Sequence, residues 1–137
     1  MNSKLLYICV IILSLLSACR EIDYIHPYYA YSVYNTTEDT VMLEVNYSKP
    51  NADLKDSVFT VCPKQTKEVC LVYPMYGQES DPSIYMESLS IMNNNTILYV
   101  QKPIQDSLWQ VIEKINVDNP QNVGVIVKYQ LTYPIAK

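Results

Sequence analysis

The feature that most constrains the fold of this chain is a strict alternation of side-chain character. Between Thr40 and Tyr47 every odd-numbered residue is apolar or aromatic, and the same holds from Val123 to Tyr133. A period of two places successive side chains on opposite faces of a β-strand, whereas a helix needs a period of 3.6. The chain is therefore expected to form half-buried β-strands.

Turn residues divide the rest of the chain into further short strands. Asn93-Asn94-Asn95 and the Pro-containing segment 118–122 predict turns, since Asn tolerates left-handed backbone angles and Pro presets a turn angle. The segment 108–117 fits either a strand or a helix, and we favour the strand. The remaining expected strands are 29–35, 57–62, 68–73, 84–92 and 96–101.

Strands of this number and spacing predict an all-β fold. Turn signals recur every 8–12 residues or so, and the 13 tyrosines with abundant Val and Ile suit strands. We expect an immunoglobulin-like antiparallel β-sandwich of about seven to eight strands, with a small β-barrel as the alternative. Residues 28–137 would form this single domain.

The first eighteen residues have the layout of a secretory signal peptide. Lys4 supplies a positive charge, the segment 5–16 is almost wholly apolar, and two small residues precede Cys19. The apolar run is shorter than the ~20 residues that cross a bilayer. We therefore expect removal of residues 1–18, which leaves 119 residues, enough for one domain.

The segment Leu16-Ser17-Ala18-Cys19 resembles a bacterial lipobox. The resemblance implies cleavage before Cys19, lipid attachment to its thiol, and residues 19–27 as a lipidated tether. An Asp at position 20 would resemble an inner-membrane retention signal, but this residue is Arg. We therefore expect the outer membrane, on its periplasmic face or at the cell surface. The expected membrane contact is thus the covalent lipid itself.

The whole layout resembles small lipoproteins of the Bacteroidetes group. Besides the lipobox, the resemblance depends on Tyr-Ser-Val-Tyr-Asn-Thr-Thr at 31–37, Val-Cys-Pro-Lys-Gln-Thr at 61–66 and Asp-Ser-Leu-Trp at 106–109. It brings no known activity with it.

Charge and glycine content argue against several classes of function. The processed chain would carry 9 basic and 14 acidic residues, a net charge of −5, which gives no basic footprint for nucleic acid. The chain has only two glycines, Gly77 and Gly124, too few for a phosphate-binding loop. We expect no nucleotide and no other cofactor.

Cys62 and Cys70 are candidates for a disulfide. A hairpin that turns near Thr66 would place them opposite each other, and an oxidising compartment would permit the bond. The alternative is two reduced, partly buried thiols. The spacing is not Cys-x-x-Cys and no histidine lies nearby, so a zinc or redox site is not expected.

Three tripeptides resemble the Asp-Ser/Thr-apolar acceptor of general O-glycosylation in Bacteroidetes. They begin at Asp39, Asp56 and Asp106, and the hydroxyl-bearing residues are Thr40, Ser57 and Ser107. The alternative is that Asp-Ser and Asp-Thr are simply good turn chemistry before a strand.

The aromatic residues offer the remaining candidate site. Trp109, with Tyr76 and other tyrosines near the 74–83 loop, is a candidate for stacking on a glycan or peptide, although packing inside the sandwich is the favoured alternative. His26, the only histidine, lies in the tether, where it lacks the rigid frame of a catalytic base. We therefore expect a non-enzymatic envelope lipoprotein that scaffolds or contacts another envelope protein. A glycan- or peptide-binding module is the alternative, and a small hydrolase is less favoured.

Overall fold

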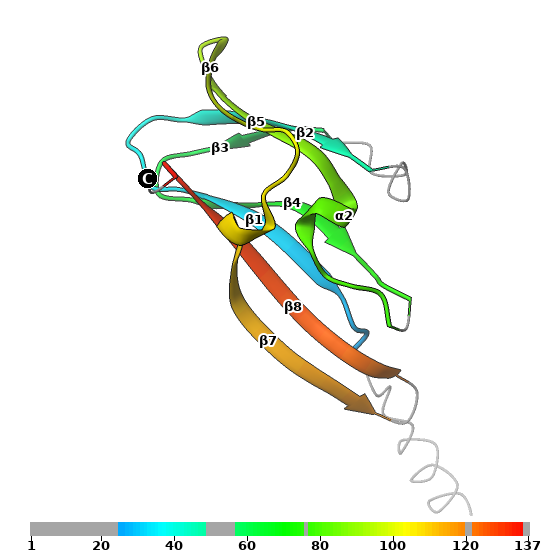
Figure 1. The fold of residues 1–137 in the computed structure, drawn as a ribbon. Coiled ribbons are helices and arrows are strands. Elements are labelled where there is room, and N and C mark those ends of the chain that lie inside the picture. Colours follow the sequence, from blue (N-terminus) through cyan, green and yellow to red (C-terminus); the bar gives the residue numbers. More distant parts are fainter. Residues whose placement is uncertain (1–24, 49–56, 76, 120–121, 136–137) are drawn as a thin grey trace, which may run out of the picture.

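A computed structural model describes residues 25–48, 57–75, 77–119 and 122–135, which form a two-layer β-sandwich (Figure 1). The prediction of an all-β sandwich is confirmed, and the alternative of a closed barrel is wrong because the strands form two separate sheets. The strands are β1 (Tyr29–Asn35), β2 (Val41–Tyr47), β3 (Val58–Val61), β4 (Thr66–Val72), β5 (Met86–Asn93), β6 (Thr96–Gln101), β7 (Gln110–Asn119) and β8 (Asn122–Tyr133).

Each sheet contains four strands. One has the order β4-β1-β8-β7 and the other has the order β3-β2-β5-β6. All pairs are antiparallel except β1 and β8, which run parallel from Tyr29↔Val127 to Asn35↔Tyr133, so the first sheet is mixed rather than antiparallel. The second and third strands share one sheet, whereas the immunoglobulin arrangement separates them.

The predicted alternation determines which faces are buried. In β2, Val41, Leu43 and Val45 are buried while the residues between them are exposed. On β8, Val127 and Leu131 enter the same core, which also contains residues from both sheets. The alternation therefore predicted the buried face of β2 correctly, whereas in β8 Ile126 is buried as well as Val127, although the alternation places it on the opposite face.

Two local predictions are also confirmed. The segment 108–117 is mostly strand, because β7 begins at Gln110 after a short 3₁₀ helix, η2 (Asp106–Leu108). Asn94 and Asn95 have φ values of 47° and 65° in the turn between β5 and β6. Asn adopts such left-handed angles more readily than most residues, which explains its use there.

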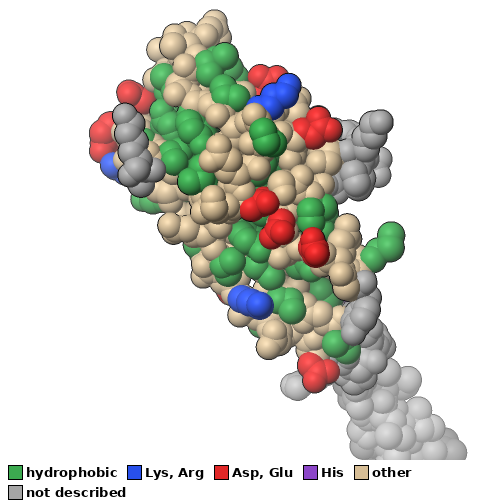
Figure 2. All heavy atoms as spheres, viewed as in Figure 1, with side chains coloured by type: hydrophobic (Ala, Val, Ile, Leu, Met, Phe, Trp, Pro, Cys, Tyr) green, Lys and Arg blue, Asp and Glu red, His purple; other side chains and the backbone are tan. Residues whose placement is uncertain are grey.

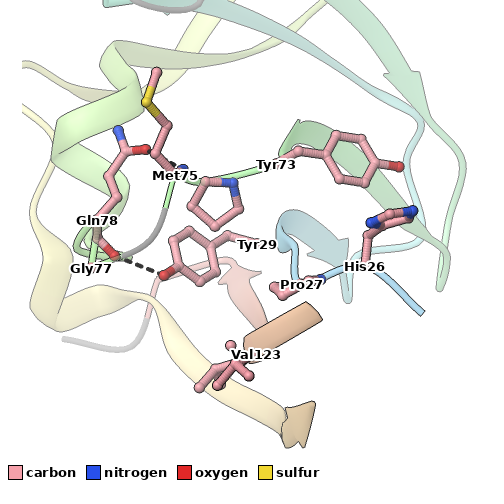
Figure 3. A pocket seen from close by; sticks show the side chains of 11 residues that line it. His26, Pro27, Tyr29, Tyr73, Met75, Gly77, Gln78 and Val123 are labelled. Carbon is pink, nitrogen blue, oxygen red and sulfur yellow. Dashed lines mark hydrogen bonds between the residues drawn. The ribbon is translucent and has the colours of Figure 1, made fainter. Parts of the chain in front are cut away.

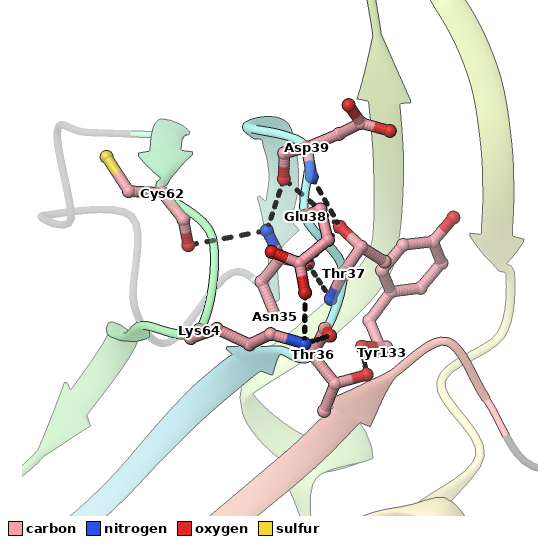
Figure 4. Close-up of polar contacts among 8 residues, drawn as sticks. All are labelled: Asn35, Thr36, Thr37, Glu38, Asp39, Cys62, Lys64 and Tyr133. Atoms are coloured by element: carbon pink, nitrogen blue, oxygen red, sulfur yellow. Dashed lines mark hydrogen bonds and ion pairs between the residues drawn. The ribbon is translucent and has the colours of Figure 1, made fainter.

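The hairpin expected from 57–62 and 68–73 does not form. β3 pairs with β2, and β4 pairs with β1, so the turn between them carries the chain from one sheet to the other. The buried Asn35 side chain donates from Nδ2 to the carbonyl oxygens of Asp39 (2.7 Å), Val61 and Cys62 (both 3.3 Å), as Figure 4 shows for Asp39 and Cys62. These bonds tie two inter-sheet connections together and hold the turn in its crossing path.

Helical structure is limited in the described residues. It comprises η2 and the four-residue α2 (Pro82–Tyr85), which begins after Asp81. Asp106 accepts hydrogen bonds from the backbone N–H (2.8 Å) and hydroxyl (2.7 Å) of Ser83, which join the two short helices. None of these helices is long and apolar enough to span a membrane, and the apolar segment 5–16 lies outside the described residues.

Candidate functional site

Trp109 belongs to the core, which overturns its prediction as a ligand-stacking residue. The side chain is only 4% exposed, and its indole N–H donates to Oε1 of Gln101 at 3.4 Å. Its ring meets Tyr31 edge-on, with 6.2 Å between centroids. A strand pattern predicts burial on one face but not which aromatic residue stays outside. The other candidate, Tyr76, lies outside the described residues.

The predicted Cys62–Cys70 disulfide is wrong for this structure, in which both thiols are free. Cys62 follows β3 and Cys70 lies in β4, and these two strands belong to different sheets, so the cross-strand geometry that would bring the two side chains together is absent. Cys62 is exposed beside the inter-sheet turn, whereas Cys70 is buried in the core. Burial, with the Glu68 carboxylate nearby, raises the pKa of the Cys70 thiol to about 12.

The three candidate glycosylation residues are all exposed. Thr40 directly precedes β2, Ser57 directly precedes β3, and Ser107 lies within η2 rather than at a strand start. Exposure meets one requirement of a modification site, and glycosylation itself stays a prediction. Cys19, the candidate lipidation site, lies outside the described residues.

A cleft of about 940 Å³ lies at the end of the sandwich where the described chain begins (Figure 3). Tyr29 of β1 is buried at its inner side, and Val123 and Val125 of β8 line one wall. The opposite wall comes from the loop after β4, and the rim includes the tether residues His26 and Pro27. The loop residues are Tyr73, Pro74, Met75, Gly77 and Gln78.

Buried tyrosines fix the loop that forms this wall. The hydroxyls of Tyr29, Tyr85 and Tyr31 donate to the successive carbonyl oxygens of residues 78, 79 and 80, at 2.8, 2.8 and 2.7 Å. The Ser80 hydroxyl also bonds the hydroxyl of Tyr129 at 2.7 Å. Four aromatic side chains from β1, α2 and β8 thus hold three consecutive loop residues, so the wall is preorganised before any ligand arrives.

The tyrosine rings form one packed cluster beneath the loop. Tyr31 stacks on Tyr129 with a centroid separation of 5.3 Å and an interplanar angle of 11°, and it also contacts Tyr85 at 5.8 Å. Burial, followed by the neighbouring Tyr29, raises the pKa of Tyr85 to about 12, and burial also raises the pKa of Tyr31. Tyr85 and Tyr31 therefore stay uncharged near neutral pH.

The lining of the cleft carries no Lys, Arg, Asp or Glu among the described residues. The Tyr29 hydroxyl bonds the Gln78 carbonyl, and Gln78 Oε1 accepts the backbone N–H of Met75 at 3.2 Å (Figure 3). Within the described chain, no group of three or more His, Cys, Asp and Glu side chains could hold a metal ion. Apolar walls with few polar groups are typical of sites that bind an apolar group.

The tether is fastened to the sheet beside the cleft. The N–H of Val127 donates to the carbonyl of Tyr28 at 3.0 Å, and Pro27 packs directly over Gly124. A Cβ on Gly124 would lie 2.5 Å from Cγ of Pro27, so the close approach needs a residue without a side chain. His26 and Pro27 are therefore part of the domain, although the sequence places them in the tether.

Sequence reasoning found one half of this site and missed the other. It associated tyrosines with the 74–83 loop, which does form a wall, but it did not bring Val123 and the residues His26 and Pro27 into the site. The length of the last strand and the absence of a Cβ at position 124 were the available signals. The chain matches no known family model, no curated protein and no solved structure.

Proposed function

We propose that this protein is a non-enzymatic lipoprotein of the cell envelope that binds an apolar ligand in the cleft beside its tether. The observation that carries the proposal is the concave apolar site between β8 and the tyrosine-held loop. Its volume of about 940 Å³ is at the upper end of ordinary ligand pockets, and its lining is mostly apolar.

The N-terminal sequence supports the location that we propose. A lipid on Cys19 would anchor the chain to the outer membrane, and His26 at the rim of the cleft follows seven residues later. Seven residues span at most about 25 Å even when fully extended. The cleft would therefore stay close to the membrane surface, at the end of the domain that faces the lipid.

The anchor is tested by replacing the proposed lipidation site. Cys19→Ala should abolish the mass increase due to lipid, because the Cys19 thiol is the proposed lipid acceptor. It should also abolish removal of the signal peptide. Cys62→Ala is the matched control, since it removes an exposed thiol that the proposal does not use. Unchanged processing and membrane fractionation in Cys19→Ala would refute the proposed address.

Ligand binding is tested with N-phenyl-1-naphthylamine, an uncharged probe whose fluorescence rises in apolar sites. The purified protein should bind it saturably, and Val123→Glu should weaken binding by more than about tenfold, because a carboxylate then lines an apolar wall. Ile97→Glu places the same charge on an equally exposed apolar residue of β6, outside the cleft, and should bind as the parent does. Probe binding that is absent, or equally weakened by both variants, would exclude the cleft as a binding site.

A specific feature of β6 supports protein contact as a second candidate function. β6 is an edge strand, its six residues carry no charge, and Ile97, Leu98 and Val100 are exposed. Figure 2 shows hydrophobic side chains gathered over the end of the molecule where Figure 1 draws β5 and β6. Unpaired apolar edges are templates for pairing with another chain.

A photoreactive amino acid at position 98 tests this second function in the host cell. It should give a discrete adduct with another envelope protein, whereas the same group at the exposed position 44, on the central strand β2, should not. Equal labelling at both positions would show that the edge has no preferred partner.

A further inference from the structure

The mouth of the cleft is surrounded by exposed apolar side chains. Tyr73 is 67% exposed, Met75 is 84% exposed and Val123 is 60% exposed, and all three line the cleft. Ile25, one residue before the rim residue His26, is 60% exposed. An apolar rim around an apolar cleft is costly in water, and such clusters mark contact sites.

The polar groups in the lining limit what the cleft can accept. The Tyr29 hydroxyl and Gln78 Oε1 are both engaged inside the protein, with the Gln78 carbonyl and the Met75 N–H respectively. A sugar or peptide would bury hydroxyl or amide groups there, and a buried polar group without a hydrogen-bond partner weakens binding. A hydrocarbon chain has no such groups, so it incurs no penalty of this kind.

Charge around the cleft also matters for the choice of occupant. The lining has no Lys or Arg to bind a carboxylate or phosphate, and Asp118 lies directly opposite Val123 in the β7–β8 pair. A free fatty acid or an anionic headgroup would find no Lys or Arg here, and the one basic side chain of the lining, His26, lies at the rim. An uncharged chain, with its headgroup left outside the cleft, fits these surroundings best.

The position of the mouth identifies where such a chain comes from. The described chain enters at Ile25, and the proposed anchor at Cys19 lies seven residues before His26. Because this segment spans at most about 25 Å, the mouth lies within one short tether of the bilayer. Hydrocarbon chains are abundant there, and the apolar rim would face them.

We propose that the cleft takes up one acyl chain of a bilayer phospholipid, while the rim of Ile25, Tyr73, Met75 and Val123 rests against the membrane surface. This inference depends on the proposed function, because it requires both the apolar site and the anchor. The chain enters between β8 and the loop held by the tyrosines, and the headgroup remains at the surface. Binding is noncovalent. Its driving force is the removal of the apolar rim and walls of the cleft from water, because the acyl chain itself already lies in hydrocarbon within the bilayer.

The test uses the lipid-anchored protein in vesicles of phosphatidylcholine that carries a diazirine on one acyl chain. After illumination, the adducts should map to the peptides containing residues 73–75 and 123–125. Met75→Glu should lower the yield at these peptides by more than about fivefold, because it puts a carboxylate at the mouth. Ile97→Glu, a matched exposed apolar residue outside the cleft, should leave the yield unchanged.

Three results would overturn the inference. Adducts confined to residues outside the cleft would show that no acyl chain enters it, and equal yields in Met75→Glu and the parent would show that entry does not use this mouth. A parallel sample carries the diazirine only on the lipid of Cys19, in unlabelled vesicles. If adducts in the cleft arise only in that sample, the occupant is the protein's own lipid and not a bilayer phospholipid.

The outcomes separate this inference from the proposed function. If the naphthylamine probe binds the cleft but phosphatidylcholine gives no adduct there, the cleft binds apolar ligands and its assignment to an acyl chain is wrong. If the probe does not bind, the proposed function as an apolar binding site is wrong.

Discussion

Tyr31→Phe is the sharpest test of the tyrosine-held loop. Tyr31 is fully buried, and its hydroxyl donates to the Ser80 carbonyl at 2.7 Å. The substitution keeps the ring, and with it the stacking on Tyr129 and the edge contact with Trp109. Loss of one hydrogen bond costs about 1 kcal/mol, and a carbonyl that loses its donor in a partly buried setting raises this to about 1–3 kcal/mol. We expect Tyr31→Phe to lower the free energy of unfolding by about 2 kcal/mol.

Urea unfolding followed by circular dichroism measures this loss. With a slope of about 2 kcal/mol per molar urea, the midpoint should fall by about 1 M. Tyr99→Phe is the matched control, because the Tyr99 hydroxyl has no hydrogen-bond partner among the described residues, and it should change the free energy by less than about 0.5 kcal/mol. Hydrogen exchange should also quicken at residues 78–81 in Tyr31→Phe only. Equal midpoints for the two variants would refute the role of the hydroxyls in holding the loop.

Four further results are expected. Gly124→Ala should destabilise the protein by about 1–3 kcal/mol and speed proteolysis near Pro27, because the new Cβ would overlap the proline ring; an unchanged proteolysis rate would contradict this packing. In native protein a thiol reagent should modify Cys62 but not Cys70, and after unfolding it should modify both thiols. Stability should fall as pH rises above about 9, because the unfolded Cys70 thiol ionises there while the folded one, with a pKa of about 12, does not, and Cys70→Ala should reduce this fall. Protein purified from its host should carry at least one glycan on Thr40, Ser57 or Ser107, and an intact mass that shows only the lipid addition would refute this.

The fold class was predictable because strand periodicity is a local property. The alternation from Val41 to Val45 states which side of β2 is buried, and this remains true whichever strands lie beside it. Asn94 and Asn95 likewise act within their own turn, where their left-handed angles are needed. Features of this kind depend on a few neighbouring residues, so they can be predicted from a single sequence.

Sheet membership was not predictable because it is decided at long range. The residues around Pro63 suit a hairpin turn, and they equally suit a turn that joins two sheets. What distinguishes the two is Asn35, which reaches the carbonyls of Val61 and Cys62 from β1. The failed disulfide has the same origin, since Cys70 opposes Tyr31 in the ladder instead of Cys62.

The cleft itself follows from unequal strand lengths. β8 has twelve residues and β7 has ten, whereas β2 has seven and β3 has four. In Figure 1 the β7–β8 hairpin extends beyond the other sheet, toward the end where the chain enters. Val127 and Leu131 belong to the core and Val125 packs against it, whereas Val123 lies beyond it, where the loop after β4 forms the opposite wall of the cleft. When a strand extends beyond the sheet that packs against it, its terminal apolar residues are exposed to water unless another segment or a ligand covers them. In this protein the loop after β4 covers these residues only in part. The tyrosine hydroxyls bind carbonyl oxygens of this loop and hold it in a position that leaves the cleft open.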